Sequence, residues 1–269
     1  MSVAVGKIEY KINDSKVHAY GISHTNDEMI SALTHEVHDK VYDVAGNSDL
    51  IDSILKDFSE TGFTKDLLMP IFTCNECIND WEIGEAYAQT YLEDHFSSIL
   101  PWSLSRDIKK PCSSLPGADI VGLYLQDKSA SFLFGEIKTS SDQDSPPNLM
   151  YGTTGLKKQL VDLCTESSTI FSLVKYLGFR LRSTKYWSMY QVAFQKYYNN
   201  NSNIHVTGVL IRDVNPNDKD LAARAKSLNT YCIDKRQIDL VAVYLPQNAI
   251  SRFVTIVESE HERRQTAKC

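Results

Sequence analysis

Residues 117–138 constrain the fold of this chain more than any other part of the sequence. Residues 118–125 and 130–138 are rich in Val, Ile, Leu, Phe and Tyr, a composition typical of half-buried strands. Residues 126–129 are polar and favour a tight turn. The sequence therefore predicts an antiparallel hairpin with two apolar strands.

Three charged residues interrupt this apolar hairpin: Asp119, Glu136 and Lys138. If the turn is centred between residues 127 and 128, Asp119 lies opposite Glu136, and Lys138 shares a face with Glu136 because side chains alternate along a strand. Opposed carboxylates have Cβ atoms about 5 Å apart and repel each other, unless a divalent cation lies between them. The alternative is an exposed hairpin edge that carries charges against aggregation. Both strands are too apolar for that, so we expect a metal-assisted site that suits phosphodiester hydrolysis, with the lysine stabilising a developing anion.

A helix is predicted before the hairpin, over residues 78–98, with Asp80 as its N-cap. Helical spacing predicts an inward face made of Trp81, Glu85, Ala88 and Leu92. Glu85 then points toward the core, whereas Glu82 lies on a different face and is the second choice for an inward glutamate. The alternative for Glu85 is a carboxylate at the helix edge that reaches water.

The hairpin and helix together resemble the PD-(D/E)xK nuclease superfamily. Asp119 stands at the position of the D and Glu136-Ile137-Lys138 at the ExK, while Gly117-Ala118 replace the usual preceding proline. The resemblance covers residues 78–245 and implies an α/β fold with a restriction-endonuclease-like core, a mixed β-sheet flanked by helices. It also implies that Asp119, Glu136 and Glu85 bind Mg²⁺ or Mn²⁺ and that Lys138 assists catalysis.

A polar, proline-containing loop follows the hairpin over residues 139–151, and a helical pattern then runs over residues 154–176. The superfamily places a Gln or Lys on this helix to hold the scissile phosphate, which would be Gln159 or its neighbour Lys158. An ordinary surface pair is the equal alternative for these two residues.

The charge of the chain is uneven along its length. Residues 1–100 hold 18 acidic and 6 basic side chains, whereas residues 101–269 hold 16 and 22. No acidic residue occurs from residue 167 to residue 212, where basic and aromatic side chains alternate. Such a segment suits a DNA-binding groove with stacking platforms, to which we assign Arg180, Arg182 and Lys185. For at least half of the aromatics, packing in the core is the alternative.

A narrower resemblance is to the nuclease subunits of the Hachiman anti-phage defence system (the HamA family). It depends on a length near 270 residues, an acidic N-terminal part, Glu-Ala-Tyr-Ala in the helix, and Gly-Ala-Asp-x-x-Gly followed by Gly-Glu-Ile-Lys. It implies a DNA nuclease restrained by a partner helicase. A site-specific restriction endonuclease and a non-catalytic, nuclease-like subunit that regulates a helicase are the alternatives.

The chain is predicted to divide into an acidic extension with α+β structure at residues 1–77, which would bind the partner, and a nuclease domain at residues 78–269. Cys74-Asn-Glu-Cys77 has no second pair at zinc-ribbon spacing, and the spacing of His35 and His38 does not fit a helical zinc site. We expect the two histidines on an outer helix face. The absence of a long apolar run and of a signal-peptide pattern, with six scattered cysteines, predicts a cytoplasmic protein without membrane association.

Overall fold

The computed structural model describes residues 2–13, 16–58, 78–107, 117–126 and 129–267. These residues form one seven-stranded sheet in the order β1-β2-β7-β6-β5-β4-β3. Strands β2, β7, β6 and β5 are parallel, and the remaining pairs are antiparallel. The strands are β1 (Lys7–Ile12), β2 (His18–Ser23), β3 (Ser98–Ile99), β4 (Ile120–Gln126), β5 (Ser129–Ser140), β6 (Ile204–Arg212) and β7 (Gln237–Tyr244).

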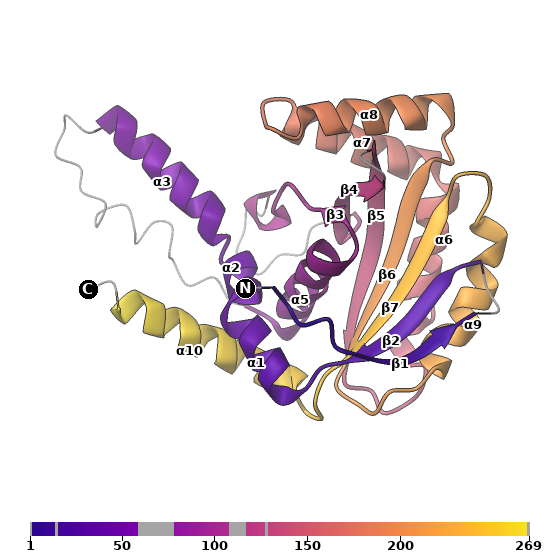
Figure 1. Ribbon diagram of the computed structural model, residues 1–269, viewed down its shortest axis with the longest axis horizontal. Helices are drawn as coiled ribbons and strands as arrows, with labels where there is room; N and C mark the ends of the chain where they lie inside the picture. The colour runs from indigo at the N-terminus through magenta and orange to yellow at the C-terminus, as the bar shows by residue number, and fades with distance from the viewer. Residues whose placement is uncertain (1, 14–15, 59–77, 108–116, 127–128, 268–269) are drawn as a thin grey trace.

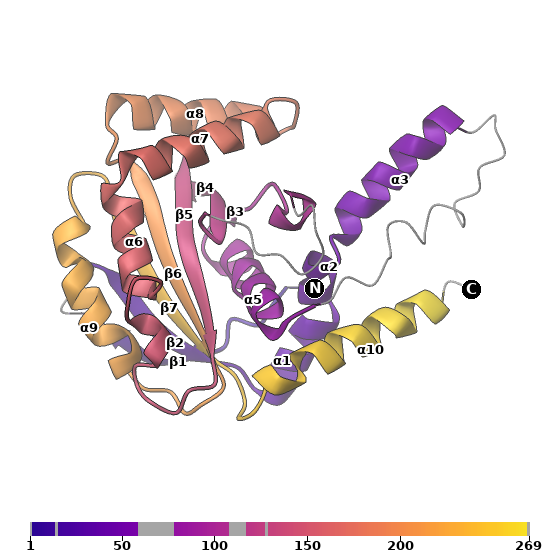
Figure 2. The same cartoon turned by 180° about the vertical axis from the view of Figure 1, so that it is seen from behind.

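Helices cover both faces of the sheet (Figures 1 and 2), so the predicted α/β architecture with a mixed, flanked sheet is confirmed. One face carries α1 (Asn26–Thr34), α2 (Glu36–Val41), α5 (Asp80–His95) and α10 (Phe253–Thr266). Helix α3 (Val44–Phe58) follows α2 and extends away from the sheet. The other face carries α6 (Leu156–Thr165), α7 (Ser167–Leu181), α8 (Trp187–Asn199) and α9 (Lys219–Leu228).

The central parallel strands are buried on both faces, as the near-continuous apolar run of β7 predicts. Along β6, Val206 and Leu210 pack toward α6–α9, while Val209 and Ile211 pack toward α5 and α10. The alternation of side chains along each strand thus feeds two separate cores from one sheet.

The hairpin has the predicted register. Ile120 pairs with Gly135 and Gln126 pairs with Ser129, which places Asp119, just before β4, opposite Glu136. The turn at residues 127–128 lies outside the described residues.

The N-terminal strands belong to the central sheet. β2 pairs in parallel with β7 from His18–Asp239 to Ser23–Tyr244, and β1 pairs with β2 at the sheet edge. Residues 1–77 therefore contribute two strands to the same sheet as residues 78–269, and the boundary predicted at residue 77 lies outside the described residues.

Two helix predictions are wrong. The pattern over residues 154–176 is not one helix, because the chain leaves helical geometry at Glu166 and α7 begins anew at Ser167. Trp81 does not lie on the inward face of α5, since it is 39% exposed; the buried residues of this helix include Ile83, Tyr87 and Tyr91. In the described part of the chain, no helix has the length and apolar character needed to cross a membrane.

Candidate active site

The three charged residues of the hairpin lie where the pairing between β4 and β5 ends. Among the described residues, pairing between β4 and β5 ends at Ile120–Gly135, whereas β5 continues to Ser140. On its other side β5 remains paired with β6, and Glu136 lies beside Gly208. Phe132 and Phe134 of β5 face the α6–α9 side, so Glu136 and Lys138, at even positions of the same strand, share that face.

Glycine at position 208 brings a helix close to this edge. A Cβ atom there would lie 2.8 Å from Leu160 Cδ1 and 3.5 Å from Leu156 Cδ1, two buried side chains of α6. Helix α6 can therefore pack directly against the strand beside Glu136.

Asp119 is fixed by two hydrogen bonds across the edge. Its Oδ2 accepts from the backbone N–H of Ile137 at 2.8 Å. Its backbone carbonyl accepts from Nε2 of Gln89, on α5, at 2.9 Å. The carboxylate is thus oriented from β5, and the backbone beneath it is tied to α5.

Glu136 is a buried carboxyl with unused hydrogen-bonding capacity. It is 3% exposed, and its Oε2 has no hydrogen-bond partner in the described part of the chain. Lys138 Nζ lies 3.6 Å from this oxygen, an ion-pair distance too long for a good hydrogen bond. Burial raises the pKa of Glu136 well above its usual range; the charge of Asp119 raises the pKa further, and Lys138 opposes the shift.

Glu85 joins these residues from α5. Burial is the largest cause that raises its pKa above the usual range, followed by the charge of Asp119, while Lys138 lowers it. Glu82 has another task, because its Oε2 accepts from the backbone N–H of Asn79, at 2.7 Å, in a capping box at the start of the helix. Glu85, rather than Glu82, therefore lies within electrostatic reach of Asp119 and Lys138, which themselves lie beside Glu136. We call these four residues the carboxylate cluster.

A glycine allows α5 to approach β5 at this point. A Cβ atom on Gly84 would lie 2.0 Å from Thr139 Oγ1, so any side chain there would push the helix and the strand apart. Gly84 precedes Glu85 directly, and Thr139 follows Lys138. The close contact therefore fixes how far Glu85 reaches toward the sheet edge.

The carboxylate cluster fits a hydrated divalent cation better than a cage of protein ligands. Within the described ranges, no group of three or more His, Cys, Asp or Glu side chains is arranged to hold a metal ion. Mg²⁺, however, commonly uses one or two carboxylates and fills its remaining positions with water and substrate phosphate. Asp119 and Glu136 supply such a pair, and Oε2 of Glu136 has no hydrogen-bond partner among the described residues, with Lys138 Nζ 3.6 Å away. Glu85 lies close enough to Asp119 for the charge of Asp119 to raise its pKa.

The residues predicted to contact DNA do not converge on the cluster as a group. Lys158 forms an ion pair with Asp162 on the surface of α6. Gln159 is half-buried, and its Oε1 has no hydrogen-bond partner among the described residues.

Arg180 has a structural role. Its guanidinium pairs with Asp107 and lies over the rings of Trp102 and Tyr176, at 4.9 and 5.3 Å from their centroids. Arg182 and Lys185 are exposed. Arg182 has no ion pair within the described chain, and Lys185 Nζ lies 5.1 Å from the centroid of the Tyr186 ring.

Sequence reasoning missed Gln89 and Gly84. Gln89 and Glu85 are i and i+4 neighbours on α5: Gln89 donates to the backbone carbonyl of Asp119, and the charge of Asp119 acts on Glu85. Gly84 could have been found from the sequence, because a glycine in a helix interior lowers helix stability and therefore indicates a position where another element packs closely.

The histidine pair was also predicted wrongly. His38 is buried rather than on an outer face, and its Nε2 lies 3.1 Å from Nδ1 of His261, on α10. Cys74 and Cys77 lie outside the described residues.

No protein-family model matches this chain, and no curated protein matches it.

Proposed function

We propose that this chain is a metal-dependent DNA nuclease with a restriction-endonuclease-like core. One observation carries the proposal: the buried carboxyl of Glu136 lies opposite the half-buried Asp119 and beside Lys138 at a sheet edge, and a third carboxyl, Glu85, approaches Asp119 from α5. Stability alone does not explain this arrangement, since burial and mutual repulsion make each ionised carboxylate costly. A cation supplies the positive charge that the carboxylates lack, and a phosphodiester supplies an anionic partner for Lys138.

Asp119 and Glu136 would hold Mg²⁺ or Mn²⁺, with Glu85 as a further ligand or as an acceptor for a metal-bound water. When bound, the metal lowers the pKa of a water molecule and neutralises charge on the phosphate. The hydrogen bond from Ile137 N–H fixes the orientation of the Asp119 carboxylate, which would serve as a ligand. Lys138 is placed to position the attacking water or to stabilise the negative charge that develops on the phosphate.

The test is degradation of plasmid DNA by the purified chain with Mg²⁺, with Mn²⁺ and with EDTA. The proposal expects nicking or degradation with either metal, no cleavage in EDTA, and no cleavage by Glu136→Gln. A restriction endonuclease would leave discrete fragments, whereas an effector nuclease without sequence preference would leave a smear. Cleavage that persists in Glu136→Gln would contradict the assignment of the cluster.

We also propose that the chain acts in the cytoplasm in an anti-phage complex with a helicase, docked on the acidic N-terminal part. The support is the uneven charge of the chain and the position of α3, which extends away from the sheet and exposes Leu50. Co-purification of the chain with the helicase encoded beside it tests this proposal. Replacement of Asp49 and Asp52, on α3, by Lys should weaken the complex, while the same change at Glu258 and Glu262, on α10, should leave it intact. The reverse result would place the interface elsewhere.

A non-catalytic subunit remains the rival class, and the same preparation separates the two. If the complex forms but neither the chain nor the complex cleaves DNA with either metal, the chain regulates its partner without chemistry. The intact set of Asp119, Glu136 and Lys138 supports the catalytic proposal.

A further inference from the structure

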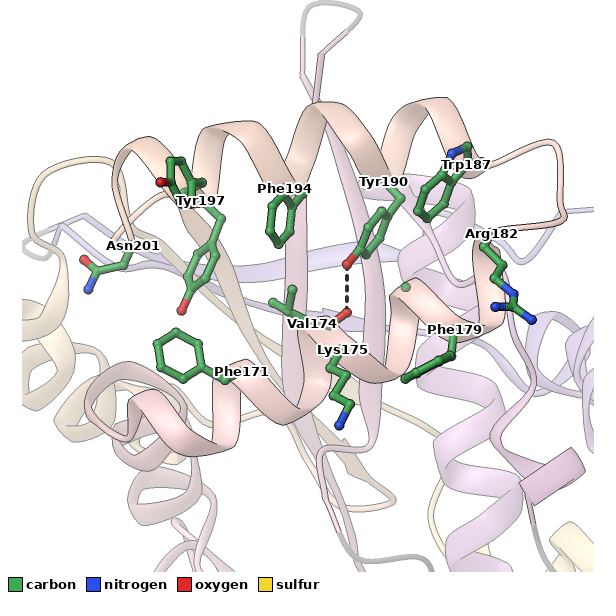
Figure 3. Close-up of a pocket in the computed structure, with 12 residues that line it drawn as sticks. Phe171, Val174, Lys175, Phe179, Arg182, Trp187, Tyr190, Phe194, Tyr197 and Asn201 are labelled. Atoms are coloured by element: carbon green, nitrogen blue, oxygen red, sulfur yellow. Dashed lines mark hydrogen bonds between the residues drawn. The ribbon is translucent and has the colours of Figure 1, made fainter.

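A groove separates α7 from α8 on the side of these helices that faces away from the sheet (Figure 3). Its volume is about 750 Å³, and twelve residues line it. Seven of these are aromatic, and its only charged lining residues in the described part of the chain are Lys175 and Arg182. We call it the aromatic groove. Its lining belongs to neither the carboxylate cluster nor its supports.

The aromatic groove exposes ring surface that a folded chain normally buries. Phe171 and Phe179, on α7, are 57% and 61% exposed, and Phe194 and Tyr198, on α8, are 43% and 81% exposed. The α8 rings form a ladder, because Tyr190 stacks on Phe194 at 6.1 Å and Phe194 on Tyr198 at 6.4 Å, each pair tilted by 22°. These four rings are exposed side by side on one surface of α7 and α8, which makes this surface a candidate binding site.

The charge of the groove selects the kind of ligand. Lys175 and Arg182 have no ion pair within the described chain; Lys175 lies on α7 and Arg182 caps its C-terminus seven residues later, about 10 Å along the helix axis. The chain has no acidic residue from Ser167 to Arg212, which covers both walls. The groove therefore offers two unneutralised cations beside a row of aromatic rings. These charges attract an anionic ligand and disfavour a second copy of the same basic surface.

We propose that the aromatic groove binds single-stranded nucleic acid, whose unpaired bases stack on Phe179, Phe194 and Tyr198 while Lys175 and Arg182 contact phosphates. This inference rests on the proposed nuclease function and names the form of its substrate. Base stacking on aromatic side chains together with a cationic track is how proteins hold single strands without reading their sequence. In a duplex the base faces are covered by their neighbours, so the groove discriminates against it.

The aromatic groove is close to the carboxylate cluster. Its floor rings Tyr190 and Tyr197 contact Phe132 of β5 edge-on, at 5.6 and 6.0 Å. Glu136 lies four residues further along the same strand, or about 13 Å. A strand held in the groove therefore has its next few nucleotides within reach of the open edge.

An acidic amphipathic peptide is the competing occupant. A groove that receives the apolar side of a helix relies on shape-complementary pockets for branched aliphatic side chains. Here the only aliphatic lining residue in the described chain is Val174, and Tyr190 OH donates a hydrogen bond to its carbonyl at 3.1 Å, which ties α8 to α7 across the floor. A rigid floor of ring faces favours flat bases.

Fluorescence anisotropy of a labelled oligothymidylate of about twelve nucleotides tests the proposal, with the full chain in EDTA so that nothing is cut. Binding to the single strand should exceed binding to a duplex of the same length at least tenfold. Phe179→Ala and Phe194→Ala should each weaken it about tenfold, whereas Val192→Ala, an exposed position of α8 outside the groove, should not. All three side chains are more than 40% exposed, so their removal does not threaten the fold.

Salt dependence separates the two kinds of contact. Each phosphate contact contributes about −0.7 to the slope of log K against log salt for a single strand. Lys175→Gln should therefore flatten the slope by about that amount, Phe194→Ala should leave it unchanged, and Lys219→Gln, on α9, should change neither slope nor affinity. An oligouridylate, compared with the oligothymidylate, shows whether the groove prefers RNA or DNA. Equal affinity means that the groove does not contact the 2′-hydroxyl, and a preference names the nucleic acid that the groove binds.

Three results would overturn the inference. The first is equal affinity for the single strand and the duplex, and the second is unchanged single-strand binding in both Phe variants. The third is that an acidic amphipathic peptide displaces the labelled oligonucleotide whereas an unlabelled single strand does not. None of them bears on Glu136→Gln, which should bind the single strand like the wild type in EDTA. Loss of cleavage in Glu136→Gln with intact binding therefore supports the nuclease proposal whether or not the groove proposal survives.

Discussion

The carboxylate cluster and the aromatic groove break the rules of stable folding in opposite ways. The cluster buries charge, with Glu136 only 3% exposed and its Oε2 unpartnered in the described part of the chain. The groove exposes apolar rings, with Tyr198 at 81%. Both deviations cost free energy in the isolated chain, and a ligand of matching chemistry would relieve each of them. A cation suits the first, and a chain of stacked bases the second, so the two regions together describe a reaction centre and a substrate guide.

The largest expected effect separates the two regions by activity. Glu136→Gln and Lys138→Ala should each lower DNA cleavage by about a thousandfold or more, because each removes charge that the transition state needs. Glu262→Gln, an exposed carboxylate on α10, is the matched control and should cleave like the wild type. Cleavage rates on plasmid DNA test this prediction. A wild-type rate in Glu136→Gln would show that the carboxylate cluster is not the reaction centre.

Metal binding should stabilise the protein through the cluster alone. With Mg²⁺ at a hundredfold excess over Kd, the native state gains about 2.7 kcal/mol. For a chain of this size that raises Tm by about 5 °C or more. Differential scanning fluorimetry should show this shift for the wild type and for Phe194→Ala, but not for Asp119→Asn. Equal shifts in all three proteins would place the metal outside the cluster.

The pH dependence of stability gives a smaller effect. The pKa values of Glu136 and Glu85 are raised in the folded protein, so the folded state binds more protons than the unfolded state once the pH exceeds their ordinary values. In EDTA, Tm should therefore fall as the pH rises from about 5 through the raised pKa values. Glu136→Gln should flatten this fall by a few degrees, and Mg²⁺ should reverse it. A wild-type Tm that rises over the same range would show that the cluster is not strained by its charge.

The smallest effect comes from two glycines, one for each region. Gly84→Ala should move α5 away from Thr139 and lower cleavage about tenfold without changing single-strand binding, since a displacement near 1 Å is enough to slow a reaction. Gly178→Ala should do the reverse, because its Cβ would lie 2.7 Å from the Tyr190 hydroxyl under the groove. Gains in helix propensity offset part of any loss in stability in both variants. Paired cleavage and anisotropy measurements test this, and a shared effect would show that the two regions move together.

The hairpin register could be predicted from sequence because it depends on local information. A polar turn and a period of two fix which residues face each other, and Asp119 opposite Glu136 follows directly. The preference for Glu85 over Glu82 followed from helical spacing, and a second local signal supports it, since Asn79 followed three residues later by Glu82 is the pattern of a capping box.

Other features depend on contacts that no local pattern encodes. The pairing of β2 with β7 joins residues more than 200 positions apart, so nothing near His18 reveals that it lies beside Asp239. The break between α6 and α7 at Glu166 could not be predicted, because no Gly or Pro occurs there. The aromatic groove was visible only as a composition, because the sequence shows which residues are aromatic but not which of them remain uncovered.

The hydrogen bond from Ile137 N–H to Asp119 has a consequence for solubility. Beyond Gly135, β5 presents backbone to one side without a β4 partner among the described residues, and such an edge is a template for strand addition by another chain. The Asp119 carboxylate occupies the Ile137 N–H and places a negative charge there, so it blocks that template. Replacing it with alanine would remove a metal ligand and also leave an adhesive edge, which makes aggregation on storage a property to measure in every Asp119 variant.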